Sequence, residues 1–240
     1  PTRVLDSRDS KPVASGSTRG IDLSGVVAAG TTAVSLQLTA VGATGPGYLA
    51  LLAPGRGVES SSLNYAAATP VSSGAVAPVQ GTAATVFAST TTHVVADVTG
   101  VFSPSGAGFV PAQARLFDSR DTKRLQPGEV RVVQVGAPAG ASAAALGVVA
   151  VSPAKAGYLT VYPCAGAASP PGTSTVNYVA GDVIASATSV GLGPNLCVTS
   201  NAEVDVVLDL QGWFLAGGGA PFVAAAPTRL LDTRSGTGEW

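Results

Sequence analysis

The segment "AVSLQLTAV" at residues 33–41 alternates apolar and polar side chains from Val34 to Ala40. An extended chain would place its valine and leucines on one side and its polar residues, Ser35, Gln37 and Thr39, on the other. A period of two is typical of a β-strand that has one buried face. We therefore predict a half-buried strand over 33–41.

Similar short segments continue along the chain and are separated by turn signals. "TGPG" at 44–47 predicts a turn, and Pro78 in "GAVAPVQG" predicts an edge strand. "ATVFAS" (84–89) and "THVVADVTGVF" (92–102) predict a hairpin around "STTT". "GASAAALG" at 140–147 is rich in alanine, but its glycines and serine disfavour a helix.

The same pattern of segments occurs twice. "GYLALL" at residue 47 matches "GYLTVY" at residue 157, and "VVADVTGVF" at 94–102 matches "VVLDLQGWF" at 206–214. A charged box recurs as "PTRVLDSRD" (1–9), "QARLFDSRD" (113–121) and "PTRLLDTRS" (227–235). Matched blocks keep one order, as in a tandem repeat. The predicted organisation is repeat 1 at residues 1–112, repeat 2 at 113–226, and the opening motif of a third repeat at 227–240.

Each repeat is long enough to hold its own core, so we expect independent domains. The chain has 30 glycines, 17 prolines and only 11% charged residues, which suits a β protein with many turns. About seven or eight short strands per repeat, with regular turn signals, predict all-β, jelly-roll-like sandwiches. A closed barrel is the alternative.

The two cysteines, Cys164 and Cys197, both lie in repeat 2. Their counterparts in repeat 1 are not cysteines, and a pair that is present or absent together indicates a disulfide. Two free buried thiols are the alternative. A disulfide implies an oxidising compartment.

The last strand of each repeat carries an aspartate between large apolar neighbours, Asp97 in repeat 1 and Asp209 in repeat 2. A buried carboxylate needs a cationic partner, and arginine binds carboxylates with a planar fork. We therefore predict that each box is a structural clasp whose first or second arginine reaches such an aspartate, and that Asp6 caps a turn. The predicted clasp comprises Arg3, Asp6, Arg8, Arg115, Asp118, Arg120, Arg229, Asp232, Arg234, Asp97 and Asp209.

The sequence leaves the docking partner of each box open. A box can dock on the repeat before it, on the repeat that it opens, or on both. If the third box docks on a neighbouring chain, subunits join head to tail, and such an open contact builds a filament. The expected partners are therefore neighbouring repeats of the same protein, with head-to-tail self-association.

Chemistry-bearing motifs are scarce. His93 is the only histidine, and its counterpart in repeat 2 is Asp205. No nucleophile or zinc motif occurs, so we predict no enzymatic activity, no metal site and no cofactor. The net charge of −1 argues against nucleic acid as a partner, and no apolar run is long enough to insert into a membrane.

Exposed aromatic side chains are the candidates for stacking on a sugar. In the segment "GYLTVYPC" these are Tyr158 and Tyr162, and in "DLQGWF" it is Trp213. The alternating pattern of the last strand predicts that Trp213 shares a face with Asp209. A carbohydrate-binding module attached to a secreted hydrolase is therefore the alternative function.

The boxes, "GYLTVYPC" and "DLQGWF" together resemble a tandem repeat of secreted and surface proteins of high-GC actinobacteria. The resemblance covers both repeats and is stronger in repeat 2. It implies export and all-β modules, without implying an activity. We expect a secreted or cell-surface, non-catalytic structural or adhesive module, as in a surface stalk or self-assembling fibre, excised from a longer chain.

Overall fold

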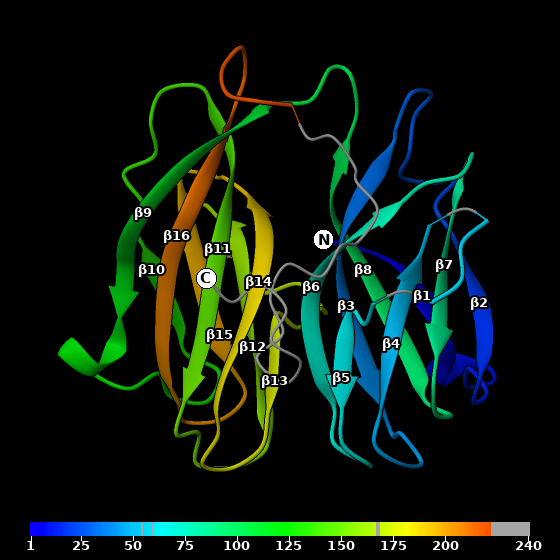
Figure 1. Cartoon of the computed structure of the whole chain (residues 1–240). Helices are drawn as coiled ribbons and strands as arrows, with labels where there is room; N and C mark the ends of the chain where they lie inside the picture. Colours follow the sequence, from blue (N-terminus) through cyan, green and yellow to red (C-terminus); the bar gives the residue numbers. More distant parts are fainter. Residues whose placement is uncertain (54, 59, 167–168, 222–240) are drawn as a thin grey trace, which may run out of the picture.

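The computed structural model describes residues 1–53, 55–58, 60–166 and 169–221, and apart from two short 3₁₀ helices their regular secondary structure is all β-strand (Figure 1). The strands form four four-stranded antiparallel sheets, two in each repeat. We call the repeat containing β1 to β8 unit 1 and the repeat containing β9 to β16 unit 2. The predicted pair of tandem β-sandwiches is confirmed.

Unit 1 places eight strands in chain order, with a short 3₁₀ helix, η1 (Ser7–Asp9), after the first. The strands are β1 (Thr2–Asp6), β2 (Ser17–Asp22), β3 (Ala33–Val41), β4 (Gly47–Leu52), β5 (Leu63–Tyr65), β6 (Val71–Pro78), β7 (Ala83–Ala88) and β8 (His93–Phe102).

Unit 2 repeats this order, with η2 (Ser119–Asp121) in the position of η1. Its strands are β9 (Gly108–Asp118), β10 (Val130–Val133), β11 (Ala141–Val151), β12 (Gly157–Cys164), β13 (Val176–Tyr178), β14 (Val183–Gly191), β15 (Asn195–Ser200) and β16 (Asp205–Leu215). The alanine-rich segment at 140–147 lies in β11, so the preference for strand over helix there is confirmed.

The strand order is that of a jelly roll. In unit 1 the sheets run β1-β8-β3-β6 and β2-β7-β4-β5, and unit 2 has the equivalent pair, β9-β16-β11-β14 and β10-β15-β12-β13. The predicted hairpin of β7 and β8 is wrong, because the chain crosses between the two sheets at residues 89–92. Local sequence cannot distinguish a sheet-to-sheet crossing from a hairpin turn.

Each unit encloses a separate apolar core between its two sheets. The largest fully buried side chains in unit 1 include Leu36, Leu38 and Leu49, and their counterparts Leu146 and Leu159 lie in the core of unit 2. These leucines come from the alternating strands of both sheets, which is how a sandwich fills its interior.

The first strand of unit 2 starts earlier than its box. β9 begins at Gly108 and pairs with the end of β16, where Val110 lies opposite Trp213. The structural boundary between the units therefore lies in residues 103–107, a few residues before the expected boundary at residue 112.

Strand β3 is buried on both faces, and not on one as its alternation suggests. Ser35, Gln37 and Thr39 are at most 7% exposed. They lie on the side of the β1-β8-β3-β6 sheet that faces away from the core of unit 1, which we call the outer face of unit 1. Strands β13 and β14 of unit 2 pack beside this sheet, against β6, β3 and β8 (Figure 1).

Candidate functional site at the arginine boxes and the unit interface

The first box enters the edge of its sheet as β1, beside β8. The pairing register shifts between Arg3 and Leu5, so Val4 occupies a bulge. A bulge breaks the alternation of side chains. Arg3 and Asp6, which strict alternation over three residues would place on opposite sides of the strand, therefore meet, and Arg3 Nη1 donates to Asp6 Oδ2 at 3.2 Å.

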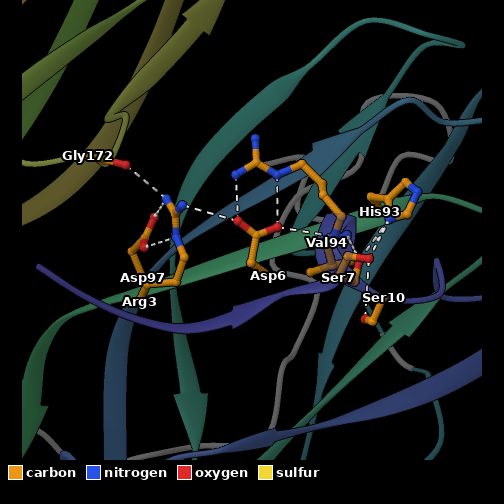
Figure 2. A network of polar contacts seen from close by, with 9 residues as sticks. Arg3, Asp6, Ser7, Ser10, His93, Val94, Asp97 and Gly172 are labelled. Atoms are coloured by element: carbon orange, nitrogen blue, oxygen red, sulfur yellow. Dashed lines mark hydrogen bonds and ion pairs between the residues drawn. The ribbon is translucent and has the colours of Figure 1, made fainter.

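Arg3 also binds the aspartate of the last strand in its own unit. Its Nε donates to Asp97 Oδ1 at 2.9 Å and its Nη2 donates to Asp97 Oδ2 at 3.3 Å (Figure 2). This is the two-point geometry that arginine offers a carboxylate. Nη2 further donates to the backbone carbonyl of Gly172, in unit 2, at 3.2 Å. Arg3 thus links β1, β8 and the neighbouring unit.

Arg8 does not reach Asp97 and instead folds back on Asp6. Its Nε donates to Asp6 Oδ1 at 2.8 Å and its Nη2 donates to Asp6 Oδ2 at 2.5 Å. Asp6 Oδ1 also accepts the backbone N–H of Arg8 at 3.1 Å, and so caps η1 as expected. These hydrogen bonds, with that of the Arg8 side chain the strongest, lower the pKa of Asp6 to about 2.

The second box repeats these contacts within unit 2. Arg115 Nε donates to Asp209 Oδ1 at 2.5 Å and Nη1 donates to Asp118 Oδ2 at 2.7 Å. Arg120 Nε donates to Asp118 Oδ1 at 2.8 Å, and this bond holds the pKa of Asp118 far below its usual range. The Asp209 carboxylate raises the pKa of Arg115. Each described box therefore docks on the last strand of the unit that it opens.

The third box lies outside the described residues, with Arg229, Asp232 and Arg234. Asp209, the last-strand aspartate of the repeat before the third box, is paired with Arg115.

A buried serine in each of the two described boxes was not singled out from the sequence. Ser7 is fully buried, and its Oγ accepts the backbone N–H of Val94 at 2.7 Å. Ser119 Oγ accepts the N–H of Val206 at 2.8 Å in the same way. Where η1 or η2 takes the place of a neighbouring strand, the serine hydroxyl thus accepts the strand N–H that a carbonyl of such a strand would otherwise accept. Its recurrence within the boxes was the available signal.

Side chains of the outer face of unit 1 hydrogen-bond to unit 2. Gln37 Nε2 donates to the carbonyl of Thr175 at 2.8 Å and to Ser186 Oγ at 3.1 Å. Ser72 Oγ donates to the same Thr175 carbonyl at 3.1 Å and accepts from the backbone of Asn177 at 3.1 Å. Buried polar groups are favourable only when they are paired. The edge of unit 2 supplies partners for the amide nitrogen of Gln37 and for the Ser72 hydroxyl, whereas Gln37 Oε1 is buried without a hydrogen-bond partner among the described residues.

The backbones of the two units approach closely at Gly74 of β6. A Cβ built on Gly74 would clash with the backbone carbonyl of Ala187 in β14, and the Gly74 N–H donates to Ser186 Oγ at 3.3 Å. The position requires glycine for space, because its φ is not in the left-handed region. Any side chain here would push the units apart.

The equivalent outer face of unit 2, on the β9-β16-β11-β14 sheet, has a different composition. The strand registers place Ala145, Gly147 and Val149 where unit 1 has Ser35, Gln37 and Thr39. No described residues of another unit cover this face, and a shallow hollow lies beside Arg115 and Asp209. The comparison of the two repeats was the signal that could have found the interface.

The residues proposed for sugar stacking do not form one surface. Tyr158 is 40% exposed, but Tyr162 is buried beside Cys164 and Cys197. Trp213 belongs to the core of unit 2, because the register shift between Leu210 and Gly212 turns its side chain inward. The placement of Trp213 on the face of Asp209 is therefore wrong, and neither Tyr162 nor Trp213 can stack on a ligand.

The predicted disulfide is confirmed between Cys164 of β12 and Cys197 of β15. It joins neighbouring strands of one sheet near one end of unit 2. The described part of unit 1 holds no such bond, since the chain has only these two cysteines.

A cleft of about 360 Å³ lies between the units. Its walls include Val101, Phe102 and Pro104 on one side and Phe214 on the other, with several serine and threonine hydroxyls. None of the described residues that line it is titratable, so the cleft offers no acid, base or charged ligand.

Two further searches of the described residues give negative results. Residues 1–53, 55–58, 60–166 and 169–221 contain no cluster of three or more metal-ligating side chains. The same part of the chain contains no helix with the length and hydrophobicity of a membrane span.

Comparison with known proteins assigns the chain to no family. No protein-family model matches it, and no curated protein is similar. A solved structure described as the crystal structure of the STIV MCP aligns with a TM-score of 0.26 and 8% sequence identity, over 88% of this chain and 96% of that chain.

Proposed function

We propose that this protein is a non-catalytic extracellular structural module, a rigid segment of a surface stalk or fibre built from tandem jelly rolls. The observation that carries this proposal is the interface between the units, where Gln37, Ser72 and Arg3 of unit 1 hydrogen-bond to unit 2. Side chains that are buried and paired across a boundary fix the orientation of two domains, whereas a flexible linker would leave them solvated.

The state of the charged residues supports a structural role for the boxes. Asp6 and Asp118 each accept bonds from two arginine side chains, and the pKa of each is lowered well below its usual range. A general acid or base works best with a pKa near the working pH. These carboxylates remain ionised at neutral pH and serve as fixed acceptors.

The disulfide supports an extracellular location, because such bonds persist in oxidising compartments. The resemblance of the boxes to actinobacterial surface repeats points the same way. Protease treatment of intact producing cells tests the location: cleavage of the chain without lysis is expected, and complete protection would contradict it.

Small-angle X-ray scattering tests rigidity. The wild-type chain should scatter as one body with a single inter-unit distance. Gly74→Val should add a clash with Ala187 and lengthen the particle, while Gly20→Val, where open space surrounds the new side chain, should change nothing. A wild-type curve that requires two independently moving units would refute the proposed stalk segment.

A further inference from the structure

The last strand of unit 2 is paired to its end on both sides, whereas that of unit 1 is not. β16 pairs with β9 as far as Leu215, opposite Gly108. β8 pairs with β1 only as far as Val98, opposite Thr2. Beyond this point β8 continues to Phe102 with β3 on one side and no described strand on the other. The end of β8 is therefore an open sheet edge, and such an edge can accept an added strand.

In unit 2 the start of β9 packs an aromatic ring on a glycine of β16. The ring of Phe109 lies where a Cβ on Gly212 would meet it at 2.3 Å, and it packs on Phe214 with ring centroids 5.4 Å apart. The equivalent glycine of unit 1 is Gly100, and among the described residues a Cβ there meets only Ser35, at 3.9 Å. Glycine within a strand often marks a close approach by another group. Unit 1 thus keeps the glycine, and no ring of the described residues packs on it.

The side chain next to this glycine differs between the units in the same sense. Trp213, opposite Val110 of β9, is 8% exposed and belongs to the core of unit 2. Its counterpart in β8, Val101, is 41% exposed. A strand added beside β8 would cover Val101 as β9 covers Trp213, and the burial of this apolar surface would favour the contact.

The open edge of β8 lies at the cleft between the units. The cleft has a volume of about 360 Å³, within the usual range of ligand sites, and its lining includes Gly100, Val101 and Phe102. The described residues that line it are uncharged. Pro221, the last described residue, also lines the cleft. Consecutive Cα atoms are about 3.8 Å apart, so the chain continues from the wall of the cleft.

The segment that follows the last described residue repeats the sequence that covers the edge in unit 2. Phe222 and Val223 precede the third box as Phe109 and Val110 precede the second. Residues 222–225, "FVAA", carry no charge and no polar side chain, which matches the uncharged lining of the cleft. These residues lie outside the described part of the chain.

We propose that residues 222–225 bind in cis along the open edge of β8, with the Phe222 ring on Gly100. Val223 then lies opposite Val101, and the segment repeats the pairing of the start of β9 with β16. The proposal deepens the structural role given above and rests on it, because the bound segment joins unit 2 to unit 1 at a second place. The cleft is then the acceptor of a strand of the same chain.

Disulfide trapping in the intact 240-residue chain tests this contact. The Val101→Cys, Val223→Cys double variant should form a bond within one chain on oxidation, because directly opposed strand positions bring their Cβ atoms close together. Non-reducing electrophoresis and intact mass measure the bond. Val183→Cys with Val223→Cys is the matched control and should stay unlinked. Val183 is 72% exposed at the start of β14, about 20 Å along that strand from the cleft-lining Ser189.

A further substitution tests the position of the aromatic ring. Gly100→Val fills the place proposed for Phe222, and a Cβ there makes only the ordinary contact with Ser35 among the described residues, so folding is retained. Added to the double-cysteine chain, Gly100→Val should abolish the bond. Gly20→Val, where no described atom lies within 4 Å of the new Cβ, should leave the bond unchanged.

The possible results separate this contact from the structural role. Bonds between chains would overturn the cis contact in favour of binding to a second copy. A bond no more frequent than in the control would overturn the contact altogether, and a bond that survives Gly100→Val would overturn the position of the Phe222 ring. The scattering experiment depends on the interface at Gly74, so it decides the rigidity of the segment separately.

Discussion

The first two boxes, each paired with the last-strand aspartate of its unit, are one motif in two environments. We call the Arg3–Asp97 region the first or covered seam and the Arg115–Asp209 region the second or open seam. At the first, the Arg3–Asp97 pair lies beneath the neighbouring unit, and Arg3 extends to its backbone. At the second, the Arg115–Asp209 pair has the same internal geometry but lies at the surface. The box itself is therefore an intra-unit clasp, and the residues around it determine whether the sheet becomes an interface.

This difference indicates that equivalent ion pairs can contribute differently to the stability of their units. Exposed pairs contribute little because water screens them, whereas the loss of one partner from a buried pair leaves a charge that is poorly solvated. The covered seam should therefore respond to mutation more strongly than the open one. The following experiments test that contrast, from the largest expected effect to the smallest.

The disulfide gives the largest expected difference between the units. Reduction should destabilise unit 2 by about 3–4 kcal/mol in the chain-entropy model, because the Cys164–Cys197 bond closes a loop with a sequence separation of 33. Unit 1 has no disulfide and should keep its own stability. Differential scanning calorimetry with and without reductant measures both. An equal shift of every transition would show that the units unfold together.

The aspartate of the covered seam comes next. Asp97→Ala should cost about 3 kcal/mol, because it removes the partner of Arg3 beneath unit 2. Asp209→Ala should cost far less, since both members of its pair are exposed. Urea unfolding of the two variants compares them directly. Equal losses would mean that burial by unit 2 does not strengthen the clasp.

A smaller effect is expected from the amide at the interface. Gln37→Ala removes the hydrogen bonds to Thr175 and Ser186 and should cost about 1–2 kcal/mol. Gly147→Ala at the equivalent position of unit 2 should stay within about 0.5 kcal/mol. Urea unfolding measures both variants. An unchanged free energy of unfolding for Gln37→Ala would indicate that water replaces the amide.

The smallest effect concerns acid. Arg8 lowers the pKa of Asp6 from its ordinary 3.8 to about 2, so the stabilisation is complete above pH 3.8 and is lost as the pH falls through 2. Stability should therefore decline between about pH 4 and pH 2. Asp6→Asn should have a shallower decline in that window, measured by urea midpoints at each pH. A slope equal to that of wild type would show that Asp6 does not contribute.

The fold class was predictable because two copies of one pattern agree with each other. Alternation in segments such as 33–41 identified the strands, and the recurrence of the box identified the repeat. The arginine and aspartate types in the boxes also identified which groups come together. Features that depend on more than one strand were not predictable. The crossing of the chain between sheets after β7, for example, has no signal in the local sequence.

The errors in the site have equally specific causes. The bulge between Leu210 and Gly212 reverses the facing of Trp213, and the bulge at Val4 brings Arg3 to Asp6. Neither insertion is visible in a period-two pattern. Gln37 was assigned to a solvent face because polar residues usually mark one, yet the partner that buries it lies more than a hundred residues later in the chain.

The polar composition of the first interface matters before the interface exists. During synthesis the N-terminal domain of a chain generally folds first. The outer face of unit 1 must then remain in water until the ribosome has delivered β13 and β14. That face presents the polar residues Ser35, Gln37 and Thr39, so unit 1 exposes no apolar surface there that would promote aggregation before unit 2 is synthesised. When unit 2 folds, the amide group of Gln37 exchanges its hydrogen bonds to water for hydrogen bonds to unit 2.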